Sequence, residues 1–144
     1  HRKQALVHAS FRWPRMKALC VDDEEGVAEL VSLYLCDLWP GADVLRAFDG
    51  ATALEIFDRE QPDLLIVDLF LPDISGYEVL HRVRRQSAMP MIAITGLADD
   101  EEIARALDLG ADALVTKPFH GSVFLARVKA VLRRCAVEFS LRGA

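Results

Sequence analysis

The chain has 144 residues, 52% of them hydrophobic and 27% charged, with a formal net charge of −5. These values are typical of one globular domain with its own core, and they argue against intrinsic disorder. No apolar run reaches the ~20 residues that cross a bilayer, and no signal-peptide pattern opens the chain, so we expect a cytoplasmic protein without membrane contact.

The placement of charge and cysteine restricts the partners further. Residues 1–15 contain four Lys or Arg and no acid, so the rest of the chain carries 13 basic against 22 acidic residues. An acidic body argues against direct binding of nucleic acid. Because Met16 would make a natural start, we interpret residues 1–15 as a cloning remnant or an upstream linker, with a basic arm as the alternative. Three cysteines without CxxC spacing favour reduced thiols, with Cys20 buried.

Strands and helices are predicted to alternate from Lys17 onward. Apolar runs predict strands at residues 17–21, 43–47, 63–67, 90–94 and 112–116. Helical spacing predicts a first helix that ends at "WPG" (39–41) and a second that ends near Arg59. Three further helices are predicted at residues 76–85, 99–110 and 122–134. We expect Asp49 to cap the second helix and Asp23 or Glu24 to cap the first. The first helix should turn Val27, Leu30, Val31, Tyr34, Leu35 and Leu38 inward.

Five strand–helix alternations predict a parallel sheet with helices on both faces. Doubly wound sheets bind their ligands beyond the carboxyl ends of the strands. The residues at those ends are Asp22, Asp23, Asp68, Thr95 and Lys117. Singly, each has an ordinary explanation as a helix cap, a turn residue or a surface charge. Together they converge on one rim of one sheet, which favours a shared site.

The charges on this rim favour a bound cation. Two unit charges at ~4 Å repel by about 4 kcal/mol at an effective dielectric constant near 20. Three carboxylates therefore need compensation, and Lys117 supplies only one positive charge. Mg²⁺ takes oxygen ligands, often one or two carboxylates together with water and phosphate. The rim is thus suited to Mg²⁺ and an incoming phosphoryl group.

Four segments, in this order and spacing, resemble the receiver domain of two-component response regulators. They are "VDDEEG" (21–26), "LLIVDLFLPDISGYEVL" (64–80), "AITG" (93–96) and "GADALVTKPF" (110–119). The resemblance implies a receiver domain at residues 16–134, followed by a C-terminal tail or truncated linker at residues 135–144. It also implies an α/β fold, a flavodoxin-like doubly wound sheet of five parallel strands in the order 2-1-3-4-5.

The resemblance assigns a role to each acid of the rim. Asp68 would be the phosphate acceptor, because a carboxylate can attack phosphorus and give an aspartyl phosphate. Asp22, Asp23 and Asp68 would hold Mg²⁺, with the backbone carbonyl of Phe70 as a further ligand. The donor would be a phosphohistidine on a sensor histidine kinase or a histidine phosphotransfer domain. The chain would then be a signalling domain that assists its own modification, not an enzyme.

Thr95 and Lys117 would contact the phosphoryl oxygens, and the Lys117-Pro118 bond is often cis in proteins that this chain resembles. Movement of Thr95 toward the modified Asp68 would carry residues 97–109 between two arrangements. The output face, which can also form a homodimer in such proteins, would be the fifth strand and its flanking helices.

The chain departs from the receiver pattern at the output face. Leu114 stands where receivers commonly have Tyr or Phe, so the aromatic part of the usual switch cannot operate. Asp112 is the only acid kept of a pair that joins charges across dimers of DNA-binding relatives, although Arg127 resembles the usual basic partner. These differences argue against dimerisation by charge pairs.

Phe70 and Leu97 are the residues two positions beyond Asp68 and Thr95. A water molecule that attacks an acyl phosphate needs a polar group to orient it, and neither side chain supplies one. We therefore predict slow self-dephosphorylation.

Three other functions remain open on the residues alone. A phosphohydrolase with an Asp nucleophile would need a second acid where Phe70 stands. A flavodoxin-type module would need a Ser/Thr/Gly-rich phosphate loop after the first strand, where this chain has "DDEE". An unphosphorylated pseudo-receiver would act only as an interaction surface, although all five rim residues are retained.

Overall fold

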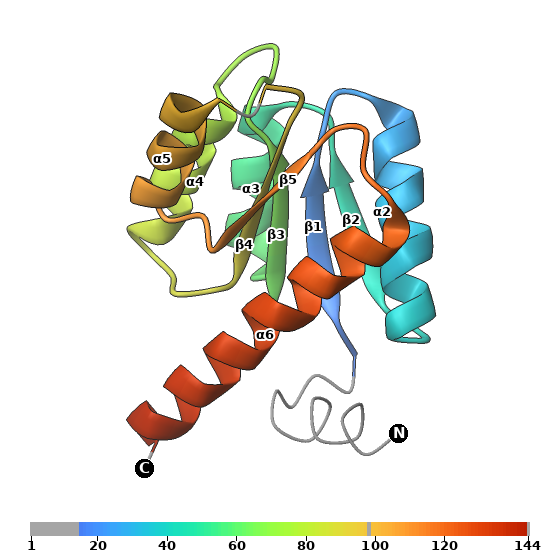
Figure 1. Cartoon of the computed structure of the whole chain (residues 1–144), viewed down its shortest axis with the longest axis vertical. Helices are drawn as coiled ribbons and strands as arrows, with labels where there is room; N and C mark the ends of the chain where they lie inside the picture. Colours follow the sequence, from blue (N-terminus) through green and yellow to red (C-terminus); the bar gives the residue numbers. More distant parts are fainter. Residues whose placement is uncertain (1–14, 98, 144) are drawn as a thin grey trace.

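The computed structural model describes residues 15–97 and 99–143, with the backbone alone for residues 136–143. Five parallel strands form one sheet in the order β2-β1-β3-β4-β5, which confirms the predicted fold class (Figure 1). The strands are β1 (Lys17–Val21), β2 (Asp43–Ala47), β3 (Leu64–Asp68), β4 (Met91–Thr95) and β5 (Ala113–Thr116). Apart from Arg15, the segment interpreted as a remnant or linker lies outside the described residues.

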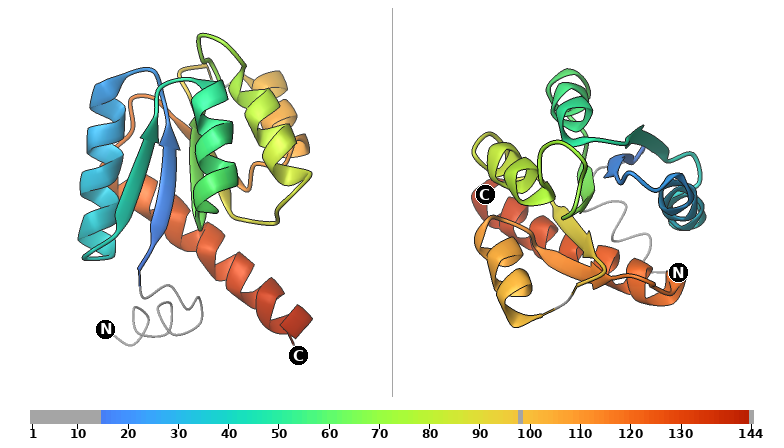
Figure 2. Two further views of the ribbon diagram at one scale, coloured as in Figure 1. Left: turned by 180° about the vertical axis from the view of Figure 1, so that it is seen from behind. Right: turned by 90° about the horizontal axis from the view of Figure 1, so that it is seen from above.

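Helices cover both faces of the sheet (Figure 2). One face is covered by α2 (Glu25–Leu38) and α6 (Gly121–Gly143). The other face is covered by α3 (Gly50–Glu60), α4 (Gly76–Arg84) and α5 (Asp100–Asp108). Because both faces of the sheet are covered, we expect polar groups at its two remaining edges, where the strands begin (the amino edge) and where they end (the carboxyl edge).

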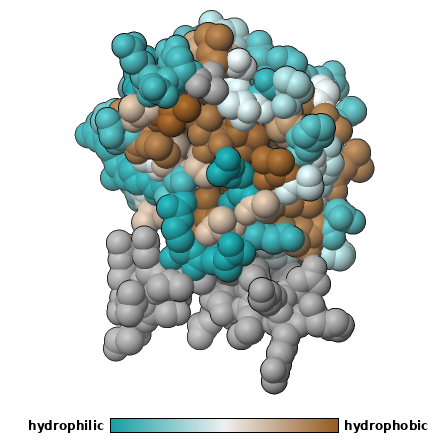
Figure 3. Space-filling view, in the orientation of Figure 1, coloured by the Kyte–Doolittle hydropathy of each residue, from teal (hydrophilic) through white to brown (hydrophobic). Residues whose placement is uncertain are grey.

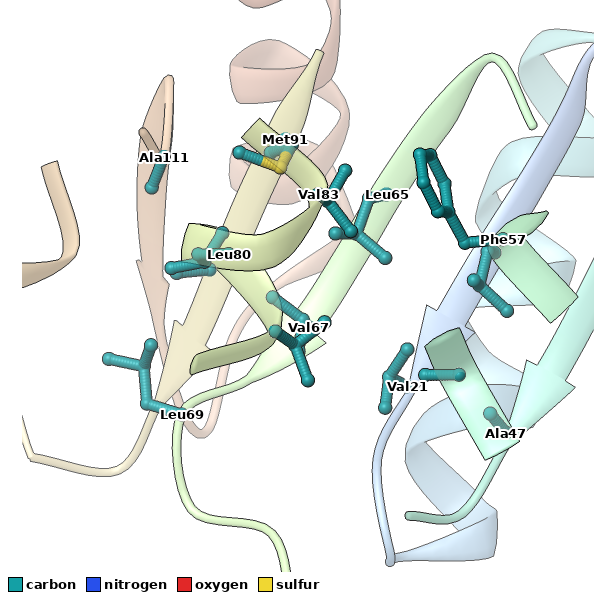
Figure 4. Close-up of a cluster of buried hydrophobic side chains, with 14 of the residues drawn as sticks. Val21, Ala47, Phe57, Leu65, Val67, Leu69, Leu80, Val83, Met91 and Ala111 are labelled. Carbon is teal, nitrogen blue, oxygen red and sulfur yellow. The ribbon is translucent and has the colours of Figure 1, made fainter. Parts of the chain in front are cut away.

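The two faces of the sheet bury separate apolar clusters, and every residue of β3 and β4 is buried. On one face, Phe57 of α3 and Leu80 of α4 belong to the same cluster as Val67 of β3 (Figure 4). Full burial of an apolar side chain of this size stabilises the fold by about 1.5–3 kcal/mol. Strands that are covered on both sides must be apolar almost throughout. For this reason the apolar runs in the sequence predicted the positions of the strands.

Helix capping agrees with the sequence at one predicted position and differs at the other. The side chain of Asp49 accepts a hydrogen bond from the Thr52 N–H at 2.7 Å, as predicted for the start of α3. For α2, the N-cap residue is Glu24, one of the two candidates that the sequence offered, but its side chain makes no capping hydrogen bond. Its N–H instead donates to Asp22 Oδ1 at 2.8 Å.

Two strands end one residue later than predicted, and both additional residues are polar. Asp68 is the last residue of β3 and pairs with Ile94, while Thr95 is the last residue of β4 and pairs with Thr116. The Leu69 N–H continues this pairing by donating to the Ile94 carbonyl at 3.0 Å. Both polar residues are therefore fixed by the sheet, because backbone pairing continues past the apolar run.

Two helix predictions need correction. Val27, Val31 and Leu35 are buried as expected, but Leu30 is 43% exposed, since the buried stripe of α2 is narrower than the apolar spacing suggested. The predicted end of α6 at Arg134 is also wrong, because the helix continues to Gly143. Neither glycine nor proline interrupts the chain between these positions, so nothing local stops the helix. In the described part of the chain, no helix combines the length and apolar character needed to cross a membrane.

Candidate functional site

The polar residues predicted at the strand ends lie at the carboxyl edge of the sheet, which is the upper edge in Figure 1. Asp22 follows β1, Asp68 ends β3, Thr95 ends β4 and Lys117 follows β5. Three of them are buried polar residues, with exposed fractions of 0% for Asp22, 5% for Asp68 and 0% for Thr95. Burial of this kind is unusual for charged groups unless they are paired or bind ions.

Lys117 contacts two of the acids at once. Its Nζ lies 2.7 Å from Asp68 Oδ2 and 2.9 Å from Asp22 Oδ2. A third contact, at 3.1 Å, reaches Glu24 Oε1, a partner that the sequence had suggested only as a helix cap. The peptide bond between Lys117 and Pro118 is cis, as the resemblance implied. The run of four acids after β1 was the available signal for the third contact.

Three carboxylates gather beside this lysine. One oxygen each from Asp22, Asp23 and Asp68 can be chosen so that all three lie within 4.8 Å of one another. Asp23 is exposed, whereas the other two are buried. This is the group of three acids that the sequence predicted at one rim.

The cluster contains more acidic than basic groups. Burial raises the pKa of Asp22 to about 6, and this effect outweighs the Glu24 N–H and the Lys117 ammonium that favour its ionised form. Burial would lower the pKa of Lys117, but its hydrogen bonds with Asp68 and Asp22 outweigh that effect and raise it above its ordinary value. The lysine therefore stays charged, while the carboxylates around it exceed it in number.

Both carboxylate oxygens of Asp68 are oriented by neighbours. Oδ1 accepts a hydrogen bond from the Phe70 N–H at 2.8 Å, and Oδ2 accepts one from Lys117. Gly76 packs against the same turn, where a Cβ atom would lie only 2.6 Å from Leu69 Cα and would also meet the Asp68 carbonyl. Only glycine permits this approach, so Gly76 belongs to the support of the site although the sequence suggested no such role for it.

The hydroxyl group of Thr95 forms hydrogen bonds with the backbone of the loop that follows β4. Oγ1 donates to the Leu97 carbonyl at 3.1 Å and accepts the Leu97 N–H at 3.0 Å. Its backbone carbonyl accepts the Lys117 N–H at 2.8 Å, which joins β4 to the lysine. The side chains of Phe70 and Leu97 are 48% and 59% exposed, so apolar surface lies beside the cluster.

The parallel fold is that of receiver domains of known structure. The chain belongs to the response regulator receiver domain family, whose sequence profile matches residues 18–129. This finding confirms the resemblance and makes the chain a response regulator receiver domain of two-component systems.

Individual relatives agree with this family. A "Probable transcriptional regulator ycf27" of Porphyridium aerugineum is 40% identical over 118 residues, which cover 82% of this chain and 48% of that protein. Regulatory protein VanRc of Enterococcus gallinarum is 38% identical over 118 residues, which cover 82% of this chain and 50% of that protein. The chain thus spans about half the length of the curated relatives it matches. Among solved structures, the BeF3-activated N-terminal receiver domain of Klebsiella pneumoniae RstA is similar, with a TM-score of 0.74 and 32% identity, covering 81% of this chain and 98% of that one.

Proposed function

We propose that this receiver accepts a phosphoryl group on Asp68 from a phosphohistidine of a histidine kinase or phosphotransfer domain. The observation that carries the proposal is the setting of the Asp68 carboxylate. One of its oxygens is bound by a backbone N–H and the other by Lys117 at 2.7 Å, at the end of a buried central strand. A carboxylate held in this way meets a bound reactant in a fixed orientation, which is a main contribution of enzymes and receivers to phosphoryl transfer.

In the transfer, an oxygen of Asp68 attacks phosphorus in line with the donor nitrogen. The new O–P bond forms as the donor N–P bond breaks, and the imidazole leaves with the electron pair. Lys117 is already held within 3 Å of both Asp22 and Asp68, and it stabilises negative charge on the transferring group without a large rearrangement. The chain assists its own modification in this way but turns over no separate substrate.

The carboxylate cluster fits a bound Mg²⁺. Asp22 Oδ2 is buried, and among the described residues its close partner is Lys117, whose Nζ lies 2.9 Å away. Such an oxygen, with two further carboxylates nearby, offers the donor set that a hard divalent ion prefers. Asp22, Asp23 and Asp68 would hold the ion, together with the carbonyl of Phe70. When bound, the ion would neutralise charge on these acids and on the phosphoryl oxygens.

The hydroxyl of Thr95 would connect modification to movement. It is engaged with Leu97, so a hydrogen bond to the phosphoryl group requires that this local contact be released or rearranged. A modified Asp68 brings three strong acceptor oxygens and about −1.5 to −2 of charge, which favours that exchange. The loop between β4 and α5 then follows Thr95, and α5 lies on the face that carries the output.

A groove between α5, β5 and α6 supports this face as the partner-binding surface. Its apolar lining includes Ile103, Leu107, Leu114, Val115 and Val123. Figure 3 shows hydrophobic residues gathered at the centre of this side of the molecule, with hydrophilic residues around and between them. A surface of this kind is typical of protein contacts.

A homodimer held by charge pairs through the same face has less support. The carboxylate of Asp112 accepts hydrogen bonds from Arg84 at 3.0 Å and from the Met91 N–H at 2.8 Å within its own chain. Both donors bind Oδ2, so the charge of Asp112 is already compensated within its own chain and a pair with a second copy would gain less. We therefore propose that a partner protein, and not a second copy bound through Asp112, occupies this face.

Intact mass after treatment with acetyl phosphate tests the proposal. With Mg²⁺ we expect the mass to rise by one phosphoryl group, and with EDTA we expect little change. Asp68→Asn should stay unmodified, whereas Asp58→Asn, at an exposed acid of α3, should behave like the parent chain. An unmodified parent chain would instead support a pseudo-receiver, and continuous release of phosphate from a phosphate ester would support a phosphohydrolase.

A further inference from the structure

Phe70 connects the Asp68 site to α4 through an aromatic contact. Its N–H donates to Asp68 Oδ1, so its position depends on the charge of that carboxylate. Its ring lies 6.5 Å from the ring of Tyr77, centroid to centroid, at an interplanar angle of 89°. Edge-to-face pairs of this kind are favourable beyond the burial of their surface. The first turn of α4 therefore holds the residue that binds the proposed phosphate acceptor.

Tyr77 is in turn contacted by α5. The guanidinium carbon of Arg105 lies 4.0 Å from the centroid of the Tyr77 ring, within the range of a cation–π interaction. Tyr77 is only 4% exposed, and its buried hydroxyl has no hydrogen-bond partner in the described part of the chain. A buried tyrosine usually finds such a partner. The ring, and not the hydroxyl, is therefore what fixes this side chain.

The position of Arg105 is also explained by the ring. Glu101 lies four residues before it on the same helix and Asp108 three residues after it, both at spacings where ion pairs form. Arg105 nevertheless makes no ion pair with any residue that the structure describes. The contact with Tyr77 is therefore the interaction that places the guanidinium.

The remainder of α5 is weakly anchored. All nine of its residues are described, and Ala106 is the only one of them that is buried. Leu107, one of its two large apolar side chains, is 45% exposed. A helix with so little buried surface can shift at a small cost in free energy. The contact between Arg105 and Tyr77 of α4 is therefore one of the interactions that hold α5 in place, beside its packing on β5.

We propose that Tyr77 and Arg105 are positioning residues that couple the Asp68 site to α5, an inference that rests on the function proposed above. When Asp68 becomes an acyl phosphate, the acceptor of the Phe70 N–H loses its carboxylate charge, and a charge-assisted hydrogen bond weakens. Phe70 then shifts against Tyr77, and the shift passes through the ring to Arg105. By linkage, loss of the Tyr77–Arg105 contact must also change the affinity of the site for an acyl-phosphate mimic.

Backbone amide NMR spectra recorded with and without Mg²⁺ and beryllofluoride test this coupling. Two sets of amides serve as readouts, residues 68–70 for the site and residues 101–108 for α5. In the parent chain we expect both sets to shift. In Tyr77→Leu and in Arg105→Gln we expect the site set to shift as before, the α5 set to shift by less than half, and the affinity for beryllofluoride to change about two- to fivefold, in line with the strength of an exposed cation–π contact.

Conservative variants separate coupling from a merely structural role. Tyr77→Phe keeps the ring and should keep the α5 response, and Arg105→Lys should restore most of it. Arg82→Gln, at an exposed arginine of α4 that pairs with Glu78, should respond like the parent chain. If Tyr77→Leu does not fold, Arg105→Gln at the surface carries the test. A full α5 response in Arg105→Gln would overturn the coupling alone, whereas absence of the site response in the parent chain would overturn the proposed function and the coupling with it.

Discussion

The two edges of the sheet carry polar clusters that differ in how well their charges are matched. At the amino edge, Arg84 donates to the carbonyls of Ser87, Met89 and Gly110 and to the carboxylate of Asp112. That carboxylate also accepts a backbone N–H, so one cation and one anion are both satisfied. At the carboxyl edge, one lysine is shared by three carboxylates, so the negative charges exceed the positive charge.

The difference separates a stabilising cluster from a functional one. Matched, hydrogen-bonded charges stabilise the folded state. An excess of buried negative charge destabilises it unless a ligand compensates that charge. Gly110 illustrates the first case, because its φ of +116° and its lack of a side chain let Arg84 lie directly against it. The carboxyl edge instead keeps an imbalance that a cation and a phosphoryl group can use.

Removal of Arg84 should have the largest effect on folding. Arg84→Ala would leave three backbone carbonyls without this donor and Asp112 without its cation, and we expect the free energy of unfolding to fall by about 2–3 kcal/mol. Urea unfolding measures this loss. Arg85→Ala, at the neighbouring exposed position, is the matched control and should change stability by less than about 0.5 kcal/mol. Equal effects of the two variants would remove the contrast between the edges.

Polar substitutions beside the acids should shorten the lifetime of the aspartyl phosphate. Phe70→Asn and Leu97→Glu each place a group that can orient water where exposed apolar side chains now stand, and we expect each to speed hydrolysis about tenfold. Decay of the phosphorylated mass over time is the measurement. Phe48→Asn, at a phenylalanine that is 44% exposed after β2, is the control and should leave the lifetime unchanged. A short lifetime in the parent chain that neither variant alters would contradict the prediction.

The smallest effect concerns Asp73, an acid at the carboxyl edge whose charge is satisfied. It accepts the N–H groups of Gly50 and Ala51 at 2.8 and 2.9 Å, and these hydrogen bonds lower its pKa. A folded-state pKa below the unfolded value of about 3.9 contributes stability above that pH, which is lost as the pH falls through the folded pKa. Asp73→Asn should therefore be slightly less stable than the parent chain at pH 7, and the difference should shrink as the pH falls below about 3.9 and through the folded-state pKa.

Unfolding midpoints in urea across this pH range measure the effect, with Glu55→Gln as a control at an exposed acid of α3, the helix whose first N–H groups Asp73 accepts. A difference between Asp73→Asn and the parent chain that does not shrink as the pH falls below about 3.9 would mean that the charge of Asp73 does not stabilise the fold.

Much of the fold could be predicted from the sequence because the strands of a buried parallel sheet are apolar throughout. β1 and β2 begin and end at the predicted residues, and the other strands lie within one residue of the prediction. The convergence of Asp22, Asp68 and Lys117 followed from the same parallel order, since carboxyl ends of parallel strands share one edge. The end of α6 could not be placed, because its last turns carry no breaking residue before Gly143.

The contacts that distinguish the two edges could not be predicted, since they join residues far apart in the chain. Arg84 and Asp112 are 28 residues apart, and Lys117 reaches Glu24 across 93 residues. The local sequence around such a side chain does not indicate which distant residue it will contact. The pairing of Tyr77 with Arg105 is of the same type, because it depends on how α4 and α5 pack.

The central claim, that the carboxyl edge keeps unmatched negative charge for a cation, is tested most directly by the stability of Asp22→Asn with EDTA and with Mg²⁺. Because the pKa of Asp22 is raised to about 6, its ionised form is unfavourable in the fold at pH 8, and the neutral amide should be more stable than the parent chain in EDTA by about 1 kcal/mol. Mg²⁺ at about 100 times its Kd should stabilise the parent chain by about 2.7 kcal/mol and the variant far less. A variant that is less stable than the parent chain in EDTA, and that gains as much from Mg²⁺, would contradict the account.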